Sequence, residues 1–369
     1  MIRLNGGAPL SSILFTIWTI LGIQLPALAQ ENDKVQKAIA LVNEVQLSHS
    51  LPSLSVAVSK GGEVIFSRAE GFSDLEMAVP ASIETKYRVG SISKSITAVL
   101  TLILMQKEFI NLDLPIQDYC PDFPKKKYSL NLRQLLTHQA GIRHYDFDNI
   151  EEEYYSTTRY NTSSESLLIF KNDTLISKPG DKYHYSSYGY SLIGCAIENV
   201  TQSSFQQALT DYIFKPTGMN NTLLDYPEYI IRNRAKPYDL SENGEITNSR
   251  SVDLSNKFPG GGILSTPSDL VQFGNSLLHN KLLTAENMDV LWTEQKTSKG
   301  ESTYYALGWR TSKDKNYVYH GGSSAGGKSL ILIIPQDDLV VAFATNASKF
   351  PISRLEFAQQ LATLFSNSK

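Results

Sequence analysis

The stretch Val89-Gly90-Ser91-Ile92-Ser93-Lys94-Ser95 decides how this sequence is interpreted, because it places a hydroxyl and an amine three residues apart at the start of a predicted helix. Side chains with this spacing are neighbours on a helix surface, so the Lys94 amine can reach the Ser91 hydroxyl. The N–H groups at a helix start favour developing negative charge, and together with burial they lower the pKa of a nearby lysine. Ser91 is therefore a candidate nucleophile and Lys94 its candidate proton acceptor. The apolar residues that follow at helical spacing predict a buried amphipathic helix: Ile96, Val99, Leu100 and Ile103.

A simpler interpretation of the same stretch is a serine that caps a helix, with a solvated lysine one turn later. The pattern S-x-x-K also occurs at Ser312–Lys315 and Ser366–Lys369, where no apolar helical repeat follows. The motif alone does not distinguish a nucleophile from a cap, so the decision depends on the rest of the chain.

Length and composition indicate a folded α/β protein. The 369 residues suit one α/β core with an insertion, and 19% charged with 41% apolar residues excludes a disordered or membrane-embedded chain. The formal net charge is −3 and no sustained basic run is present, so nucleic acid and anionic membranes are not expected partners.

Residues 1–29 have the pattern of a signal peptide. Arg3 is their only charge, an apolar run extends from about Ile13 to Ile23, and Ala27-Leu28-Ala29 is typical of a cleavage site. The apolar run is too short for a membrane anchor. We therefore expect an exported protein, periplasmic or secreted, with no membrane-spanning segment after cleavage.

Only two cysteines are present, too few for a disulfide framework. Cys195 lies in a predicted apolar helix over residues 192–197, where a buried free thiol is the default expectation. A bridge between Cys120 and Cys195 is the alternative in an oxidising compartment.

Strand patterns occur near both ends of the chain. Apolar runs over residues 54–58 and 64–66 flank Gly61-Gly62, which predicts a β-hairpin. Continuous apolar runs over residues 330–334 and 339–343 predict central strands covered on both faces.

Helices are predicted next to these strands, over residues 34–47 and from Ser353 onward. Strand patterns are scarce between about 95 and 255. We expect one domain over 30–369, of the α/β (α+β) type, with an antiparallel sheet flanked by terminal helices. Its sheet part covers about 30–94 and 256–369, and a helical subdomain is inserted over about 95–255.

Two further segments are candidates for the same site as Ser91. One is Tyr183-His184-Tyr185-Ser186-Ser187-Tyr188-Gly189-Tyr190, ahead of the helix that contains Cys195. The other is His320-Gly321-Gly322-Ser323, expected between two predicted strands. Its glycines allow a backbone to approach a ligand closely, and a strand edge there can offer an N–H to an oxyanion. The alternative is a hairpin turn beside a core histidine.

Taken in order, S-x-x-K at 91–94, Tyr-x-Ser at 185–187 and His-x-Gly at 320–322 resemble the motifs of the serine β-lactamase and penicillin-binding protein superfamily, class C type. The segments over residues 71–76, 135–142 and 260–266 are similar to further class C-type segments. Those over 141–145 and 185–190 most resemble the mitochondrial β-lactamase-like serine protease and its bacterial relatives. The resemblance covers about residues 35–350 and implies the β-lactamase/transpeptidase-like fold, with the site between the sheet and the helical subdomain.

The resemblance also implies roles for individual residues. Ser91 is the nucleophile, Lys94 its proton partner and Tyr185 the second general acid or base. The expected substrate-binding residues are Ser187, His320 and Gly322, and the oxyanion hole consists of the backbone N–H groups of Ser91 and Ser323.

Two departures from the family pattern affect the expected substrate. Ser187 stands where an amide is usual, and His320 replaces a lysine and is mostly uncharged at pH 7. They favour a peptidase or esterase acting on a small peptide, amide or ester. The alternative is a β-lactamase or DD-peptidase acting on cell-wall peptides.

Other functional classes fit less well. Gly322-Ser323-Ser324-Ala325-Gly326 matches the nucleophile elbow of α/β-hydrolases, but that fold needs a histidine after the serine and His320 is the last one. No H-E-x-x-H is present and the six histidines are scattered, so neither a metal nor a cofactor is expected. A non-catalytic binding or self-assembling protein on the same fold is the remaining alternative, and the sequence does not indicate an oligomeric state.

Overall fold

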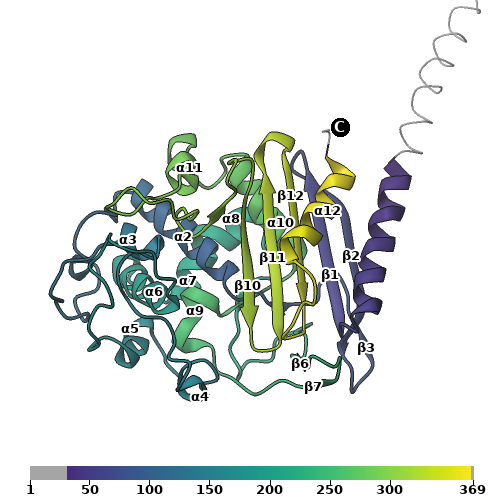
Figure 1. Ribbon diagram of the computed structural model, residues 1–369, viewed down its shortest axis with the longest axis horizontal. Coiled ribbons are helices and arrows are strands. Elements are labelled where there is room, and N and C mark those ends of the chain that lie inside the picture. Colours follow the sequence, from purple (N-terminus) through teal and green to yellow (C-terminus); the bar gives the residue numbers. More distant parts are fainter. Residues whose placement is uncertain (1–30, 367–369) are drawn as a thin grey trace, which may run out of the picture.

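A seven-stranded antiparallel sheet forms one side of the molecule in the computed structural model, which describes residues 31–366 (Figure 1). Its strand order is β3-β2-β1-β12-β11-β10-β9. The predicted fold class is confirmed, whereas the predicted signal peptide lies outside the described residues. The strands are β1 (Ser53–Lys60), β2 (Glu63–Asp74), β3 (Val79–Pro80), β9 (Arg310–Thr311), β10 (Val318–Ser324), β11 (Gly327–Ile334) and β12 (Leu339–Thr345).

The predicted hairpin and both predicted central strands are present in this sheet. Gly61 and Gly62 adopt φ values of +59° and +84°, a conformation open to glycine that joins β1 directly to β2. A single turn of 3₁₀ helix, Pro335–Asp337, joins β11 to β12. Strand β12 pairs with β1, so the first and last strands of the chain lie together at the centre of the sheet.

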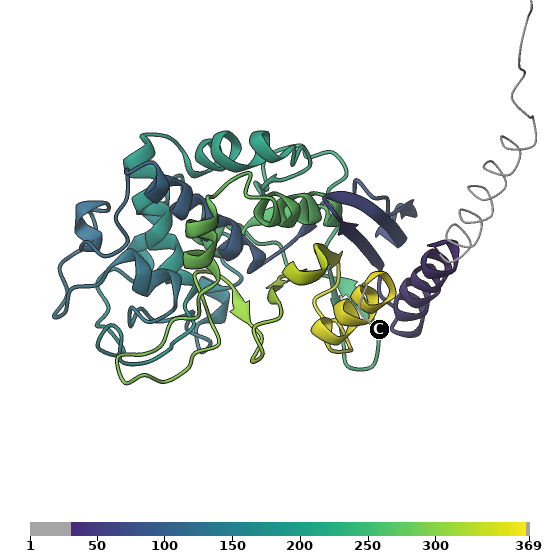
Figure 2. The same ribbon diagram turned by 90° about the horizontal axis from the view of Figure 1, so that it is seen from above.

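Alternate residues of the central strands face opposite sides of the sheet, as the pleat requires. Val341 and Phe343 pack against the helix over residues 31–48 and α12 (Arg354–Phe365). Val340 and Ala342 belong to the core on the other face, which α10 (Pro267–Leu278) and α2 (Ile92–Gln106) cover. Figure 2 shows the two terminal helices on one side of the sheet and α10 on the other.

Helices dominate the part of the molecule beside the sheet. The longest is α6, which packs against α2 and α9. It extends over Ser187–Thr201. The other helices in this part are shorter: α3 (Leu132–Leu136), α4 (Ile150–Glu153), α5 (Ser163–Ser166), α7 (Phe205–Leu209), α8 (Lys215–Thr217), α9 (Phe258–Gly261) and α11 (Ala285–Trp292). Over residues 31–366, no helix is both long enough and apolar enough to cross a bilayer.

Short strands also occur where mainly helix was expected. β5 (Leu223–Leu224) joins β4 (Tyr87–Arg88) and β8 (Ile263–Ser265) in a three-stranded sheet. β6 (Tyr238–Leu240) and β7 (Ile246–Asn248) form a separate pair. Strands of two or three residues are too short to produce a periodic pattern, which is why the sequence did not reveal them.

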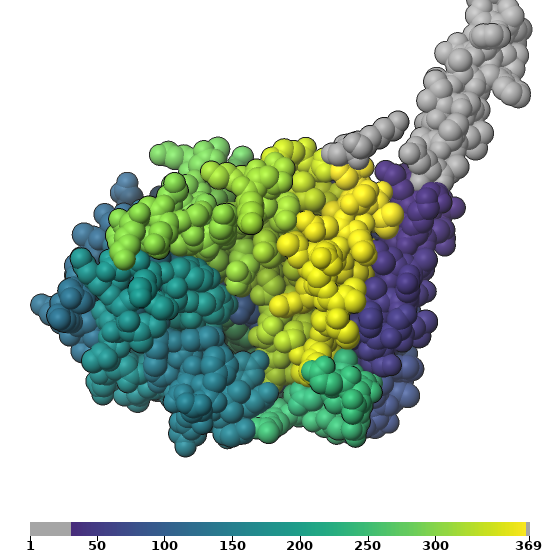
Figure 3. All heavy atoms as spheres, viewed as in Figure 1, coloured from purple at the N-terminus to yellow at the C-terminus, as the bar shows by residue number. Residues whose placement is uncertain are grey.

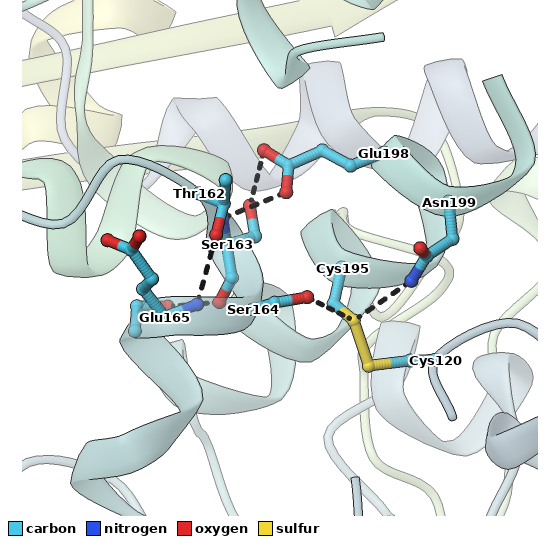
Figure 4. Close-up of a disulfide and its surroundings, with 9 residues drawn as sticks. Cys120, Thr162, Ser163, Ser164, Glu165, Cys195, Glu198 and Asn199 are labelled. Carbon is cyan, nitrogen blue, oxygen red and sulfur yellow. Dashed lines mark hydrogen bonds between the residues drawn. A yellow bond between two sulfur atoms is a disulfide. The ribbon is translucent and has the colours of Figure 1, made fainter. Parts of the chain in front are cut away.

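Cys120 and Cys195 form a disulfide, so the expected buried free thiol at Cys195 was wrong (Figure 4). Their Cα atoms lie 5.7 Å apart, although 75 residues separate them in the chain. The pairing arises because the loop after a 3₁₀ turn at Ile116–Asp118 packs against the middle of α6, a long-range contact that local sequence patterns do not report. The bridge ties that loop to the helix that begins at Ser187.

The glycine motif near the C-terminal end also differs from expectation. His320, Gly321, Gly322 and Ser323 lie inside strand β10 and not between strands. The turn comes at Ala325-Gly326, where Gly326 has φ +60°.

Strand β10 contacts the turn that carries Ser91. A Cβ atom on Gly322 would lie 1.8 Å from the Val89 carbonyl oxygen, and one on Gly90 would lie 2.6 Å from the Ser323 nitrogen. The Val89 N–H donates to the Ile263 carbonyl at 3.1 Å. The turn is therefore held between the small sheet and β10, and only glycine permits the close approach.

We predict that Gly322→Ala lowers the free energy of unfolding by about 1–3 kcal/mol or more, because the added methyl group overlaps a backbone carbonyl that cannot move independently. Urea titration measures the change. Gly321→Ala is the matched control on the same strand, because its methyl group would meet only the end of the Arg354 side chain, at 3.2 Å. Equal losses in the two variants would contradict the close approach as the cause.

Candidate active site

Ser91 precedes the first turn of α2, but it does not behave as a helix cap. Its side chain makes no capping hydrogen bond. Instead, its Oγ accepts hydrogen bonds from Lys94 Nζ at 3.2 Å and from the Tyr185 hydroxyl at 2.8 Å. Lys94 is 0% exposed, so the interpretation as a cap with a solvated lysine does not apply.

Lys94 is surrounded by acceptors from three segments of the chain. Its Nζ donates to the Gly260 carbonyl at 2.6 Å and to Ser187 Oγ at 3.0 Å, in addition to Ser91. Burial and, to a smaller extent, the positive charge of Arg310 together lower the pKa of Lys94 to about 7. A large fraction of the amine is therefore neutral near pH 7 and able to accept a proton.

Tyr185 has the opposite tendency. Burial raises its pKa to about 12, which outweighs the hydrogen bond with Ser91. At neutral pH it is a phenol that can donate a proton or relay one, and it is not a phenolate base.

Two histidines orient the start of α6, where Tyr185 and Ser187 lie. His138 Nδ1 accepts the Ser186 N–H at 3.1 Å, and His144 Nδ1 accepts the Ser187 N–H at 3.3 Å. The ring of His138 lies 4.3 Å from the Tyr185 ring, and His144 meets it edge-on at 5.5 Å. The sequence analysis assigned these histidines no role.

His320 lines the cleft, but both of its ring nitrogens bond to the protein. Nδ1 lies 2.8 Å from the Gly321 carbonyl, which can only accept, so Nδ1 carries the proton and Nε2 accepts from the Tyr305 hydroxyl at 3.0 Å. Burial and the charge of Lys94 lower the pKa of His320 to about 3. The ring is neutral at pH 7, as expected, and no ring nitrogen remains to hold a substrate carboxylate.

Of the remaining predicted site residues, two line the cleft and one does not. Ser187 and Ser323 line the same cleft as Ser91. The backbone of Ser323 lies against Gly90, which brings the two predicted oxyanion donors to one place. Gly322 does not line the cleft, and its role in the structure is the close approach of β10 to Val89.

The cleft has a volume of about 580 Å³ and lies between the sheet and the helical part of the molecule. Figure 3 shows it as a hollow between the teal surface and the yellow-green surface. Tyr145, Phe147 and Tyr154 line its helical side, and Leu330 and Leu355 its sheet side.

Three basic residues in this cleft were missed by sequence reasoning. They are Lys257 ahead of α9, Arg310 on β9 and Arg354 at the start of α12. Arg354 donates to the carbonyls of Gly322 and Ser329. No local pattern distinguishes these residues from surface cations, because only the packing of distant elements brings them to Ser91.

Rival chemistries find no support in the described part of the chain. No group of three or more His, Cys, Asp or Glu side chains over residues 31–366 could hold a metal ion. The G-x-S-x-G segment ends β10 and enters a hairpin to β11, whereas a nucleophile elbow requires a strand followed by a helix.

Comparisons with known proteins agree with this geometry. A family model described as Beta-lactamase matches residues 31–363. Serine beta-lactamase-like protein LACTB, mitochondrial, of Homo sapiens is 28% identical over 82% of this chain and 72% of its own. Protein flp of Staphylococcus aureus (strain MW2) is 26% identical over 92% of this chain and 68% of its own.

Solved structures share the fold. The octameric penicillin-binding protein homologue from Pyrococcus abyssi has a TM-score of 0.76 at 24% identity, covering 89% of this chain and 77% of that one. The D-amino acid amidase from Ochrobactrum anthropi SV3 has a TM-score of 0.76 at 22% identity, covering 91% of this chain and 99% of that one. With the family model matching nearly the whole described chain, this protein belongs to the serine β-lactamase and penicillin-binding protein superfamily.

Proposed function

We propose that this chain is an exported serine hydrolase that works through a Ser91 acyl-enzyme on a small peptide, amide or ester. The observation that supports this most strongly is the buried Lys94 amine, which lies 3.2 Å from Ser91 Oγ and is partly neutral near pH 7. A surface lysine beside a capping serine has neither property. Relatives of the same fold include an amidase and the hydrolase EstCE1, which fits this class of reaction.

In the proposed reaction, neutral Lys94 takes the proton of the Ser91 hydroxyl as Oγ attacks the substrate carbonyl carbon. The oxyanion that forms accepts hydrogen bonds from the backbone N–H groups of Ser91 and Ser323. The tetrahedral intermediate then expels the amine or alcohol, which leaves with the proton held by Lys94 and relayed through Tyr185. Water attacks the acyl-enzyme by the reverse use of the same groups and releases the acid.

Export is the part of the proposal that concerns residues 1–29. The buried Cys120–Cys195 bridge supports it, because disulfides persist in oxidising compartments. Cell fractionation and the mass of the isolated chain test it. We expect a mature protein outside the cytoplasm that starts near residue 30, and a full-length cytoplasmic protein would contradict export.

We predict that a fluorophosphonate probe forms its covalent adduct on the peptide that contains Ser91, because this is the hydroxyl next to the neutral amine. Ser91→Ala should abolish labelling and ester hydrolysis, whereas Ser324→Ala should keep both. Mass spectrometry of the digested adduct identifies the site. An adduct on Ser324, or full activity in Ser91→Ala, overturns the assignment. Competition between a penicillin and the fluorophosphonate probe tests the alternative, a cell-wall substrate.

We predict that kcat/KM for a neutral ester falls about tenfold per pH unit below pH 7, since a protonated Lys94 cannot accept the Ser91 proton. His144 and His320 have pKa values lowered to about 3 by burial, so neither titrates in this range. Burial also lowers the pKa of Lys257 to about 7, so Lys257→Met is the control and should keep the pH dependence. A flat profile between about pH 5.5 and 8.5 would rule out Lys94 as the proton acceptor.

A further inference from the structure

The lining of the Ser91 cleft is positively charged, although the whole chain has a net charge of −3. Lys257, Arg310 and Arg354 line it, and no aspartate or glutamate is among the lining residues. The cleft also contains His144 and His320, which are both neutral at pH 7. An anionic group that enters the cleft therefore meets basic side chains and no carboxylate in the lining.

The three basic residues differ in their exposure and in the interactions that they form within the protein. Arg354 donates to two backbone carbonyls beneath the cleft, and Arg310 is exposed on β9 with its guanidinium over the Tyr305 ring. Lys257 is only 3% exposed and still lines the cleft. Within residues 31–366, none of the three forms an ion pair with a carboxylate.

The Lys257 ammonium uses only part of its donor capacity. Its Nζ donates to the Tyr154 carbonyl at 2.6 Å and to the Glu153 carbonyl at 3.3 Å. An ammonium has three donors, and the third finds no acceptor among the described residues. The faces of Tyr145 and Tyr154 lie 4.8 and 4.7 Å from Nζ, which stabilises a cation but does not neutralise it.

Two carboxylates lie close enough to favour the charged form of Lys257, but neither forms an ion pair with it: Glu153 pairs with Arg143, and Asp253 with Arg159. The Glu153 carboxylate accepts two hydrogen bonds from Arg143, at 2.8 Å each, and one from the Tyr188 hydroxyl at 2.8 Å. These bonds hold Glu153 away from the cleft lining and fix the loop that presents Tyr145 and Tyr154. Burial without a paired anion is costly and lowers the pKa of Lys257 to about 7, so part of this amine is neutral in the free cleft at pH 7. A bound carboxylate at the unused donor position favours the charged form, and the geometry therefore fits a partner that the substrate supplies.

We propose that Lys257 is a specificity residue that binds a carboxylate of the substrate in the Ser91 cleft. This proposal rests on the hydrolase function proposed above and refines it: the substrate class is an anionic ester, amide or peptide. The sequence analysis considered only the charge of His320 and therefore did not specify the charge of this peptide, amide or ester.

The test compares three esters in wild type, Lys257→Met and Arg310→Gln at one pH and salt concentration. The first ester, 4-nitrophenyl hexanoate, carries no carboxylate. The second, mono-4-nitrophenyl adipate, carries one in its acyl part, and the third, 3-carboxy-4-nitrophenyl hexanoate, carries one in its leaving group. We expect Lys257→Met to lower the charged-to-neutral ratio of kcat/KM by about tenfold or more for one of the two charged esters, the scale of one charge-assisted hydrogen bond. The rate with the neutral ester should be unchanged. Arg310→Gln, which removes an exposed cation, should change the ratio less than about threefold.

A ratio that stays constant in Lys257→Met, or that falls more in Arg310→Gln, overturns the proposal. Binding without chemistry separates this failure from failure of the hydrolase function. Calorimetric titration of Ser91→Ala with glutarate should show binding that Ser91→Ala/Lys257→Met loses, whereas glutaramide should bind neither variant measurably. If glutarate binds both variants equally or neither, Lys257 is not the carboxylate site, whatever the fluorophosphonate result on Ser91.

Discussion

The burial of one amine is the constraint on which this structure depends. Removing the Lys94 side chain from water costs free energy, and the cost is limited because acceptors from α6, from the Gly260 carbonyl and from Ser91 surround Nζ. Those acceptors meet only where α2, α6 and α9 pack against one another. The desolvation that makes burial of the Lys94 amine costly also lowers its pKa, which leaves part of the amine neutral and able to act as a base. The stability of the fold and the reactivity of the site therefore depend on the same buried group.

Much of the fold could be predicted because its patterns are local. Gly61-Gly62, the apolar runs of β11 and β12, and the cap at Ser353 each define an element within a few residues. The candidate site was predictable only as far as its motifs, which supplied Ser91, Lys94, Tyr185, Ser187 and His320. The bridge between Cys120 and Cys195 was not predictable, since it depends on how a loop packs against α6.

The charge of the cleft could not be predicted from the three motifs taken one at a time. The sequence analysis took the replacement of lysine by His320 as a loss of positive charge beside the substrate. In the structure, His320 bonds to Tyr305 and to the Gly321 carbonyl, and the cations come from β9, α12 and the segment before α9. Charge in an enclosed cleft is a property of all the walls together, because low-dielectric surroundings extend the reach of each group.

The contact between Arg354 and the Gly322 carbonyl has a consequence for the order of assembly. It connects the last helix of the described chain to the strand that supplies Ser323, while Ser91 lies more than 200 residues earlier, in the first third of the sequence. Contacts this distant in sequence form late in folding, since loop closure must precede them. A chain emerging from the ribosome or from a translocation channel therefore has Ser91 and Lys94 long before it has the complete cleft, whose sheet side is finished only after synthesis has passed residue 354.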